Sequence, residues 1–460
     1  MNPPIGFRVS RILHAGYLFE GGGTKIIFDP IFENPFSVNC HAFPNVSFDL
    51  EQIKKLRPDA IFISHYHDDH CSFESLNLLD RKIPIYVFCL FDELFIMLRE
   101  LGFEKLYSLR LDETLSIGSL EVTTRRALDA EVDSIFEINY SGIKVLNVVD
   151  SWIDSEVLEI LAAKAPWDLV LWPFQTMREL EVLAPTRASP ASRSLPPEWL
   201  DQLKLLNPKF VVPSSCQFRL EDWSWYNQTF FPISYAQFQN EIESDFPKCK
   251  ILRLNPSESV ILQNQNSELT AARAEPIPWL EPLGNQNVDY SFTENLKAPR
   301  VQEIARHFPE LSSAESKRID DYCRLELPAR YLSIEREDYS YFSQPRFWRL
   351  VLYLANGSAT TYNYLIQQNH IKLIADVPGQ QLSWLTEISS YKLYCALEKG
   401  EGLTSLYLRI NDCSFSTEIE KDLLGRDGDD ALGVGKDPLI CCLYTGIFGA
   451  YQRAQLRKLS

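Results

Sequence analysis

The chain has 460 residues, with 45 Lys and Arg against 62 Asp and Glu, and a formal net charge of −17. Two or three domains are expected from this length, each large enough to bury a hydrophobic core. The charge argues against a nucleic-acid partner, because phosphate backbones are bound by concentrated Lys and Arg surfaces. The first residues lack the apolar segment of a signal peptide, and no apolar run approaches the roughly 18 to 20 residues that span a bilayer. We therefore expect a cytoplasmic protein without a membrane span.

Cysteine and histidine are distributed differently along the chain. The ten cysteines are spaced irregularly and include no CxxC pair, so we expect most of them to be buried, reduced thiols. Of the seven histidines, five lie within the first 70 residues. We therefore expect the functional residues in the N-terminal part of the chain.

Short β-type runs alternate with helical stretches from about Phe7 to Ile261. The β-type runs extend over residues 8–13, 17–20, 25–29, 59–64, 82–88, 119–124, 134–150, 168–174, 209–215 and 250–263. Helical stretches extend over residues 92–102, 154–165 and 197–206. Strands that recur between helices predict a sheet covered by helices, which is the α/β class.

A polar, proline-containing stretch without clear periodicity occupies residues 264–295 and predicts a linker. It separates a first domain over residues 1–263 from a second domain over residues 296–460. The second domain has helical stretches over 301–310, 315–327 and 390–399 and β-type runs over 347–354, 360–366, 370–377 and 403–410. This mixture predicts a smaller α+β domain, which faintly resembles sterol-carrier-like domains.

A cluster of histidines and aspartates directly follows the apolar run over 59–64. His65 and His67, two residues apart at a strand end, project to the same side and can share one metal ion. Asp69 and His70 lie one bend further on and can serve a second ion or, for Asp69, a bound water. Imidazole and carboxylate without obligatory thiolate suit zinc, iron or manganese. The alternative is a solvated turn, which three histidines within six residues make the weaker interpretation.

The pattern His65-x-His67-x-Asp69-His70 after a strand resembles the HxHxDH motif of the metallo-β-lactamase superfamily. Upstream, His14 and Asp29 stand where the branch of the ascorbate-phosphate lactonases and N-acyl-phosphatidylethanolamine phospholipases has a strand-end His and an Asp-Pro pair. Downstream, the segment KVLNVVDS resembles the strand that ends in an aspartate bridging both metals, so the resemblance makes Asp150 the candidate bridge.

The segments LNVVDS and VVPSSC are also similar to the metallo-β-lactamase-like part of the CMP-sialic acid hydroxylases. The resemblance covers roughly residues 7–262. It implies an αββα sandwich followed here by the smaller α+β domain, with the metal site where the loops meet at the sheet edges.

Two histidines that complete a two-metal site in this superfamily are missing, because the chain has no histidine between His70 and His307. Asp129 stands about where the first is expected, with Asp133 four residues later. A ligand role and a solvated loop acid remain equal alternatives for Asp129. At the second place stand Ser215 and Cys216, of which Cys216 is better explained as a buried thiol than as a ligand. The site is expected to hold one ion firmly and a second weakly or not at all, and to favour harder ions.

Other residues have two interpretations each. His14 either lines the substrate pocket near the metals or hydrogen-bonds a neighbouring loop. Trp172, Arg178 and Glu179 follow a strand end where a substrate loop would lie, although an ion-paired helix start is equally credible. His41 could swing in towards the site from the long loop after Asp29, although a loop histidine is more often an exposed side chain.

These observations and the resemblance lead to a metal-dependent hydrolase of a small organic substrate, such as an ester, lactone, amide or phosphodiester. His65 and His67 would hold one divalent ion, most simply zinc, with iron or manganese as alternatives. Asp69, His70 and Asp150 would hold or orient a second ion or the water, and a metal-bound hydroxide would attack. Asp69 is the expected acid/base partner.

Two alternatives stay open. One is an iron-dependent oxygenase on the same fold, which would need a separate electron donor because the chain has no Rieske pattern of cysteine and histidine pairs. The other is a degenerate scaffold that binds a lipid or a protein partner through its C-terminal domain. An oxygenase needs iron and consumes O₂, and a scaffold keeps its role without His65 and His67.

Overall fold

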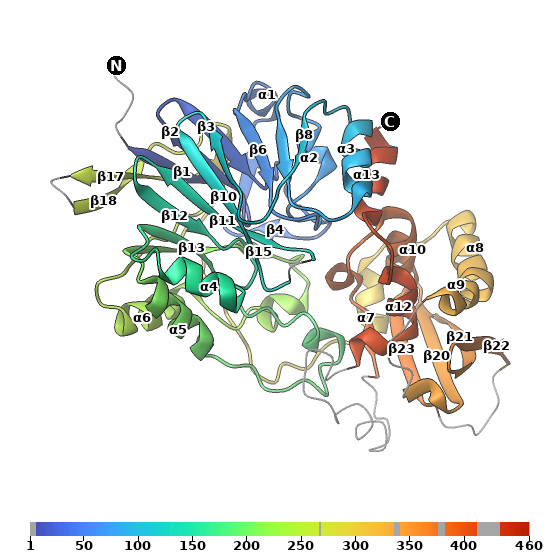
Figure 1. Ribbon diagram of the computed structural model, residues 1–460. Coiled ribbons are helices and arrows are strands. Elements are labelled where there is room, and N and C mark those ends of the chain that lie inside the picture. The colour runs from blue at the N-terminus through green and yellow to red at the C-terminus, as the bar shows by residue number, and fades with distance from the viewer. Residues whose placement is uncertain are drawn as a thin grey trace.

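The computed structural model describes residues 6–129, 131–265, 268–334, 341–375, 382–411 and 433–459. Two sheets packed face to face, with helices on their outer faces, form an αββα sandwich in the N-terminal part (Figure 1). A smaller α+β unit with its own sheet follows. The predicted fold class is confirmed.

The first sheet has eight strands in the order β18-β17-β1-β2-β3-β6-β7-β8. Antiparallel pairing joins the strands from β18 to β3, and parallel pairing joins those from β3 to β8. The strands are β1 (Phe7–Arg11), β2 (Tyr17–Gly21), β3 (Thr24–Phe28), β6 (Ala60–Ile63), β7 (Ile85–Val87), β8 (Leu106–Ser108), β17 (Ser259–Gln265) and β18 (Glu268–Ala274).

The second sheet has seven strands in the order β16-β14-β13-β12-β11-β10-β9. Strands β12, β13, β14 and β16 are parallel, and the others are antiparallel. The strands are β9 (Thr114–Ile117), β10 (Leu120–Arg126), β11 (Ser134–Tyr140), β12 (Ile143–Asn147), β13 (Leu169–Pro173), β14 (Phe210–Ser214) and β16 (Lys250–Ile251).

The core between the sheets follows from the alternation of side chains along each strand. Phe28, Phe62 and Phe136 face inward and meet, with ring centroids 4.8 Å apart for Phe28 and Phe62 and 4.9 Å for Phe28 and Phe136. Their neighbours Ile27 and Ile61 face outward into a second core. Around the two outer faces lie α1 (Leu50–Ile53), α2 (Phe73–Leu76), α3 (Asp92–Glu100), α4 (Ser155–Ala162), α5 (Pro197–Leu206) and α6 (Tyr235–Asp245) (Figure 1).

Several loops meet at one edge of the sandwich, because parallel strands end at the same edge. Strand β6 ends before His65, β12 ends before Asp150, and β14 ends before Ser215. Two short pairs cover nearby loops, β4 (His41–Ala42) with β15 (Phe218–Arg219) and β5 (Val46–Phe48) with β19 (Leu280–Pro282). The topology therefore brings together loops that are far apart in the sequence, including the loop that carries the HxHxDH motif.

The C-terminal unit has a five-stranded sheet in the order β22-β21-β20-β23-β24. Its strands are β20 (Arg346–Tyr353), β21 (Ala359–Gln367), β22 (His370–Ile374), β23 (Trp384–Ser389) and β24 (Arg409–Ile410). Its helices include α7 (Val301–Ile304), α8 (Ser313–Asp321), α9 (Leu327–Ser333), α10 (Ser390–Lys399), α12 (Pro438–Tyr444) and α13 (Ala450–Leu459). The last helix, α13, lies beside α3 of the sandwich (Figure 1).

Three segments differ from the predicted elements. The run over 250–263 divides into β16 and β17, which belong to different sheets. Residues 264–295 contain β18 and β19, which pair with the sandwich, so strand pairing continues into the predicted linker, and the division of the chain into domains stays a prediction. The run over 403–410 begins as a 3-10 helix, η6 (Leu403–Leu406), and the end of the run over 370–377 lies outside the described residues.

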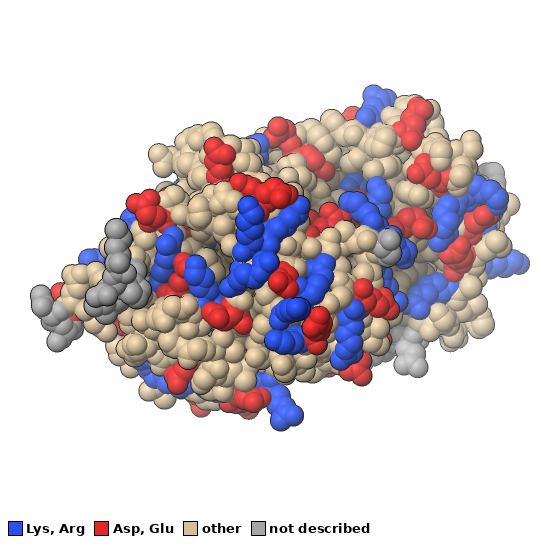
Figure 2. All heavy atoms as spheres, turned by 90° about the horizontal axis from the view of Figure 1, so that it is seen from above, with Lys and Arg blue, Asp and Glu red and all other residues tan. Residues whose placement is uncertain are grey.

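The remaining general expectations concern cysteines, membrane spans and charge. None of the described cysteines forms a disulfide and all are buried, whereas Cys413 lies outside the described residues. In the described part of the chain, no helix has the length and apolar character needed to cross a bilayer. Figure 2 shows one face, on which Lys and Arg side chains are interspersed with Asp and Glu.

Candidate metal centre

The loop after β6 carries the first group of candidate ligands, and Asp133, directly before β11, completes it. One ligand atom each from His65, His67 and Asp133 lie within 4.8 Å of one another. The His65 and His67 rings are 4.5 Å apart, and His65 Nε2 is 3.8 Å from Asp133 Oδ1. We refer to these three residues as group one.

A second group consists of His14, Asp69, His70 and Asp150, again with ligand atoms within 4.8 Å. His70 Nε2 lies 3.0 Å from Asp150 Oδ2 and 3.1 Å from His14 Nε2. His14 Nε2 lies 3.1 Å from Asp69 Oδ2. We refer to these four residues as group two. His14 therefore stands among the candidate ligands rather than only at the edge of a pocket.

The two groups adjoin each other. The rings of His65 and His70, one from each group, are 4.0 Å apart. Asp150 belongs to group two and lines the same cavity as His65, His67 and Asp133. This position is compatible with the predicted bridging role of Asp150, which remains a prediction.

Contacts behind the ligands orient the imidazole rings. Asp29 accepts hydrogen bonds from the backbone N and the Oγ of Ser64, both at 2.8 Å, and its Oδ2 lies 3.0 Å from His70 Nδ1. Ser64 Oγ also lies 3.0 Å from His65 Nδ1. Because the Nδ1 atoms face these partners, the Nε2 atoms of both rings are left for the site.

Backbone strain is concentrated around the same loops. Asp29, His14 and three successive residues, Ser215, Cys216 and Gln217, have φ values between 40° and 56°. Such conformations cost free energy in residues other than glycine and persist where the surroundings impose them. The strained turn at 215–217 is held by Arg11, which donates to the carbonyls of Pro213 (2.7 Å), His14 (2.5 Å) and Ser215 (2.9 Å).

Arg11 was missed by the sequence analysis. Its side chain is fully buried at the end of β1. The sequence shows only a charged residue next to the apolar Ile12 and Leu13 in a predicted strand. This is a weak indication of a buried charge, because strands at the edge of a sheet often carry charged side chains.

The electrostatics differ between the groups. Burial lowers the pKa of His70, but Asp150 and Asp69 outweigh burial and hold it well above its usual value. The same balance, with Asp69 and Asp150, raises the pKa of His14. In group one, burial and the neighbouring His70 and His67 hold the pKa of His65 well below its usual value.

The carboxyl groups show the complementary pattern. Burial raises the pKa of Asp150 and Asp69, but the nearby His70 outweighs burial and lowers both. Burial and the charge of Asp150 raise the pKa of Asp133 to about 6. The raised pKa values of the histidines and the lowered pKa values of the carboxyl groups thus favour imidazolium–carboxylate pairing within group two.

Two buried oxygen atoms point to a cation. Asp133 Oδ1 and Asp150 Oδ1 are buried and have no hydrogen-bond partner among the described residues. An unpaired buried carboxylate oxygen is costly unless a hydrogen bond or a metal satisfies it. With two imidazoles beside each of these aspartates, the donor set fits one or two divalent ions.

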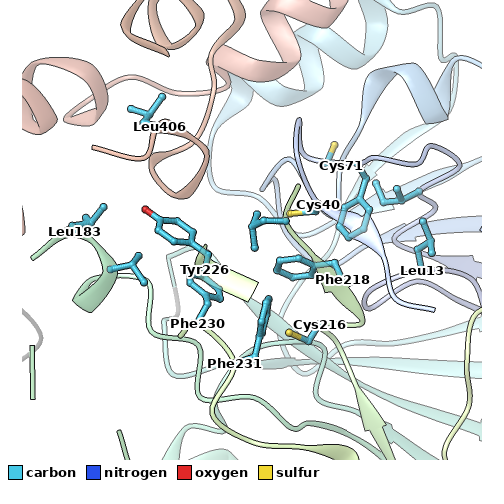
Figure 3. Close-up of a cluster of buried hydrophobic side chains, with 14 of the residues drawn as sticks. Leu13, Cys40, Cys71, Leu183, Cys216, Phe218, Tyr226, Phe230, Phe231 and Leu406 are labelled. Atoms are coloured by element: carbon cyan, nitrogen blue, oxygen red, sulfur yellow. The ribbon is translucent and has the colours of Figure 1, made fainter. Parts of the chain in front are cut away.

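Several predicted residues lie elsewhere. Asp129 belongs to neither group, because its exposed carboxylate accepts from the backbone N of Glu131 and its carbonyl accepts from the N of Asp133. The turn thus places Asp133, not Asp129, beside the histidines. Cys216 is buried in an apolar cluster with Cys71 and Phe218 (Figure 3), and burial raises its pKa. His41 in β4 pairs with Arg219 and is half-buried rather than exposed, and it belongs to neither group.

A cavity of about 710 Å³ opens beside group one. Its wall includes Trp152, Arg178 and Glu179 from the segments that follow β12 and β13. The predicted substrate loop is therefore at the cavity with Arg178 and Glu179, whereas Trp172 is only 1% exposed and belongs to the core. The volume is within the range of about 300 to 1,000 Å³ that is usual for small-molecule sites.

The chain is similar to several known proteins. Residues 8–215 match the family model of a beta-lactamase superfamily domain. Cytidine monophosphate-N-acetylneuraminic acid hydroxylase from Xenopus laevis is 31% identical over 157 residues, which are 31% of this chain and 25% of the relative. The match thus spans about a quarter of the length of that relative.

Two solved structures are also similar. A metallo hydrolase from the archaeon Ignicoccus hospitalis has 16% identity and a TM-score of 0.40, over 56% of this chain and 100% of that chain. CmlA, a diiron beta-hydroxylase from Streptomyces venezuelae, has 18% identity and a TM-score of 0.39, over 59% of this chain and 55% of that chain.

Proposed function

We propose that this protein is a metal-dependent hydrolase of a small organic substrate with a metallo-β-lactamase-like domain. The match of residues 8–215 to the family model of a beta-lactamase superfamily domain supports this proposal. One observation carries the proposal. Two adjoining groups of candidate ligands, with the His65 and His70 rings 4.0 Å apart, lie beside an open cavity of about 710 Å³. Adjacent metal sites at the floor of a substrate pocket are typical of hydrolytic enzymes.

The residues of each group would hold one divalent ion. Group one would hold the first through two imidazoles and the carboxylate of Asp133, and group two a second, more weakly held ion. A bound ion supplies Lewis acidity and lowers the pKa of a coordinated water from about 15.7 towards about 7. Zinc is the first choice, and the carboxylates also suit iron or manganese.

The chain itself would move protons at two places. His14 Nε2 and Asp69 Oδ2, 3.1 Å apart, can share a proton at the edge of group two. Glu179 lies in the cavity wall and is accessible through its mouth. Its exposed carboxylate can exchange a proton with a substrate in the cavity.

Iron-dependent hydroxylation is the second candidate, and a specific observation favours it. Group one contains two histidines and one carboxylate, which is a ligand set typical of non-haem iron oxygenases. The curated relative is named as a hydroxylase. Such a reaction would require a separate electron donor.

The experiment is metal analysis of the natively purified protein together with two assays. One assay follows cleavage of chromogenic esters, lactones, amides and phosphodiesters, and the other follows O₂ consumption with iron and a reductant. His67→Ala is the test variant, and His370→Ala, on the exposed start of β22, is the control.

Hydrolysis that is lost in His67→Ala and kept in His370→Ala would support the hydrolase. Bound iron with O₂ consumption would favour the hydroxylase instead. Absence of metal from the wild-type protein would contradict both enzymes and favour the scaffold.

A further inference from the structure

The last helix of the chain contains two buried glutamines. In α13, Gln452 and Gln455 are 2% and 5% exposed, whereas Arg453 and Arg457 are exposed. Residues three apart lie on the same face of a helix. Glutamine is rarely buried without hydrogen-bond partners, so this face must meet polar groups.

Those polar groups belong to the loop that carries the HxHxDH motif. Gln452 Nε2 donates to the carbonyl of Tyr66 at 2.8 Å and to the carbonyl of Cys71 at 3.0 Å. Tyr66 lies between His65 and His67, and Cys71 follows His70. Both hydrogens of one amide group therefore hold the two sides of the segment that carries the candidate ligands.

Gln455 extends the contact by one turn. Its Oε1 accepts from the backbone N of Phe73 at 2.7 Å, and its Nε2 donates to Ser72 Oγ at 3.1 Å. These bonds hold the start of α2, directly after the loop.

Apolar packing fixes how closely α13 approaches. Phe448, just before the helix, has its ring 4.6 Å from the rings of both Tyr66 and Phe91. Gly449 has a φ of +61°, which favours glycine, and a Cβ there would lie 2.6 Å from Met97 Cε, so a larger residue would strain the backbone and displace the Met97 side chain.

The loop has few backbone bonds of its own. The N atoms of His70 and Cys71 donate to the carbonyl of His67 at 3.1 and 2.8 Å. The carbonyls of Tyr66 and Cys71 are instead bonded by a residue about 380 positions away in the chain. The loop shape therefore depends on α13.

The same unit also contacts the segment that follows the cavity-lining residues Leu180 and Glu181. Arg409 in β24 donates to the carbonyl of Val182, in the segment after β13, at 3.2 Å. Leu406 lies in one buried cluster with Leu183 and Tyr226 (Figure 3). Because the C-terminal unit contacts both the motif loop and the segment after β13, it contributes to the arrangement of the site.

We propose that Gln452 is a positioning residue for the metal site: from the C-terminal unit, it fixes the backbone on both sides of the candidate ligands His67 and His70. The inference rests on the proposed metal function. Outer contacts of this kind typically change metal affinity by about 10- to 100-fold.

The test is metal binding by the full chain, measured as competition between the protein and a chromogenic chelator for Zn²⁺ or Mn²⁺. Gln452→Met keeps the volume and removes both hydrogen bonds. Gln452→Glu keeps the length but loses the donors. Arg453→Ala, exposed on the same helix, is the control.

We expect both Gln452 variants to bind the ion about 10- to 100-fold more weakly, and Arg453→Ala to bind like the wild type. Excess metal should restore kcat in the Gln452 variants. This recovery would distinguish positioning from a general loss of folded protein. A folded Gln452→Met protein with affinity within twofold of the wild type would overturn the proposal.

Two further readouts cover other outcomes. If Gln452→Met does not fold, Gln452→Glu carries the test, and wild-type affinity in that folded variant would overturn the proposal. Hydrogen exchange of amides 64–73 should be faster in the variants, and unchanged exchange would also overturn it. A wild-type protein that binds metal but hydrolyses nothing would contradict the proposed function alone.

Discussion

Two aspartates four residues apart have different surroundings. Asp133 lies directly before β11, where Ser134 Oγ donates to the carbonyl of Ser64 at 2.8 Å and holds the strand against the metal loop. Asp129 is on the exposed side of the turn that joins them. Of these two aspartates, Asp133 is the one placed to complete group one.

The matched pair Asp133→Ala and Asp129→Ala tests this assignment. We expect Asp133→Ala to weaken binding of the first ion by more than about 100-fold, because loss of a ligand exceeds the loss of an outer contact. Asp129→Ala should bind within about threefold of the wild type. The measurement is titration with Zn²⁺ against a chelator, and equal losses in the two variants would refute the assignment.

Metal binding should release protons from group two. In the metal-free protein the pKa values of His14 and His70 are raised, so below these pKa values the rings are charged and must lose protons to bind an ion. Affinity should therefore fall as the pH falls through the raised pKa of His70, starting above the usual value of about 6.5.

Calorimetry in two buffers of different ionisation enthalpy checks this expectation. The apparent binding enthalpy should differ between the buffers at pH 7, and His70→Gln should reduce the difference. Equal enthalpies in both buffers would show that no proton is released.

At the scale of elements, the ends of β1 and β14 are joined by one side chain. Arg11 donates to three backbone carbonyls around the strained turn at 215–217. Without the guanidinium these buried carbonyls would lose partners, each at a cost of about 1 to 3 kcal/mol. The strained turn thus depends on an interaction between sequence positions about 200 apart.

We predict that Arg11→Met lowers the free energy of unfolding by at least about 3 kcal/mol, because three carbonyls lose their donor. Arg273→Met, at an exposed position of β18, should change it by less than about 1 kcal/mol. Urea unfolding of the chelator-treated proteins measures both values. A change of less than about 1 kcal/mol in the free energy of unfolding of Arg11→Met would contradict this prediction and would mean that water donates to the three carbonyls instead.

At the scale of the whole molecule, the metal site joins segments from most of the chain. Groups one and two draw on residues between His14 and Asp150, and α13 holds their loop from the C-terminal end. Binding an ion should therefore stabilise the two sheets together with the C-terminal unit.

We expect the melting temperature to rise when Zn²⁺ or Mn²⁺ is added to the chelator-treated protein. At a free concentration of about 100 times Kd, the stabilisation is about 2.7 kcal/mol for one site. Calorimetry of the wild type, His67→Ala and His370→Ala measures it. The shift should shrink in His67→Ala and persist in His370→Ala, and a wild-type protein without a shift would argue against a native-state metal site.

Much of the sandwich was predictable because its signals are local. The apolar run before His65 and the alternation of helices and strands are properties of short segments. The proximity of His14, Asp69, His70 and Asp150 was only implied by a family resemblance, since no local rule places residues from different loops together. The run over 250–263 shows where such local prediction stops. The pattern of apolar residues in this run does not reveal that β16 and β17 belong to different sheets.

The sequence by itself determined the α/β class, the strand that precedes the motif and the residue types able to hold a divalent ion, and the family resemblance added the αββα sandwich. Only the tertiary structure decided that Asp133 rather than Asp129 joins the histidines, that Arg11 holds the strained turns, and that Gln452 bonds the metal loop. Secondary structure depends on neighbouring residues, which a sequence displays directly. Ligand sets and their supports depend on how strand ends and a distant helix pack, and that packing is settled by the burial of apolar surface in the whole chain.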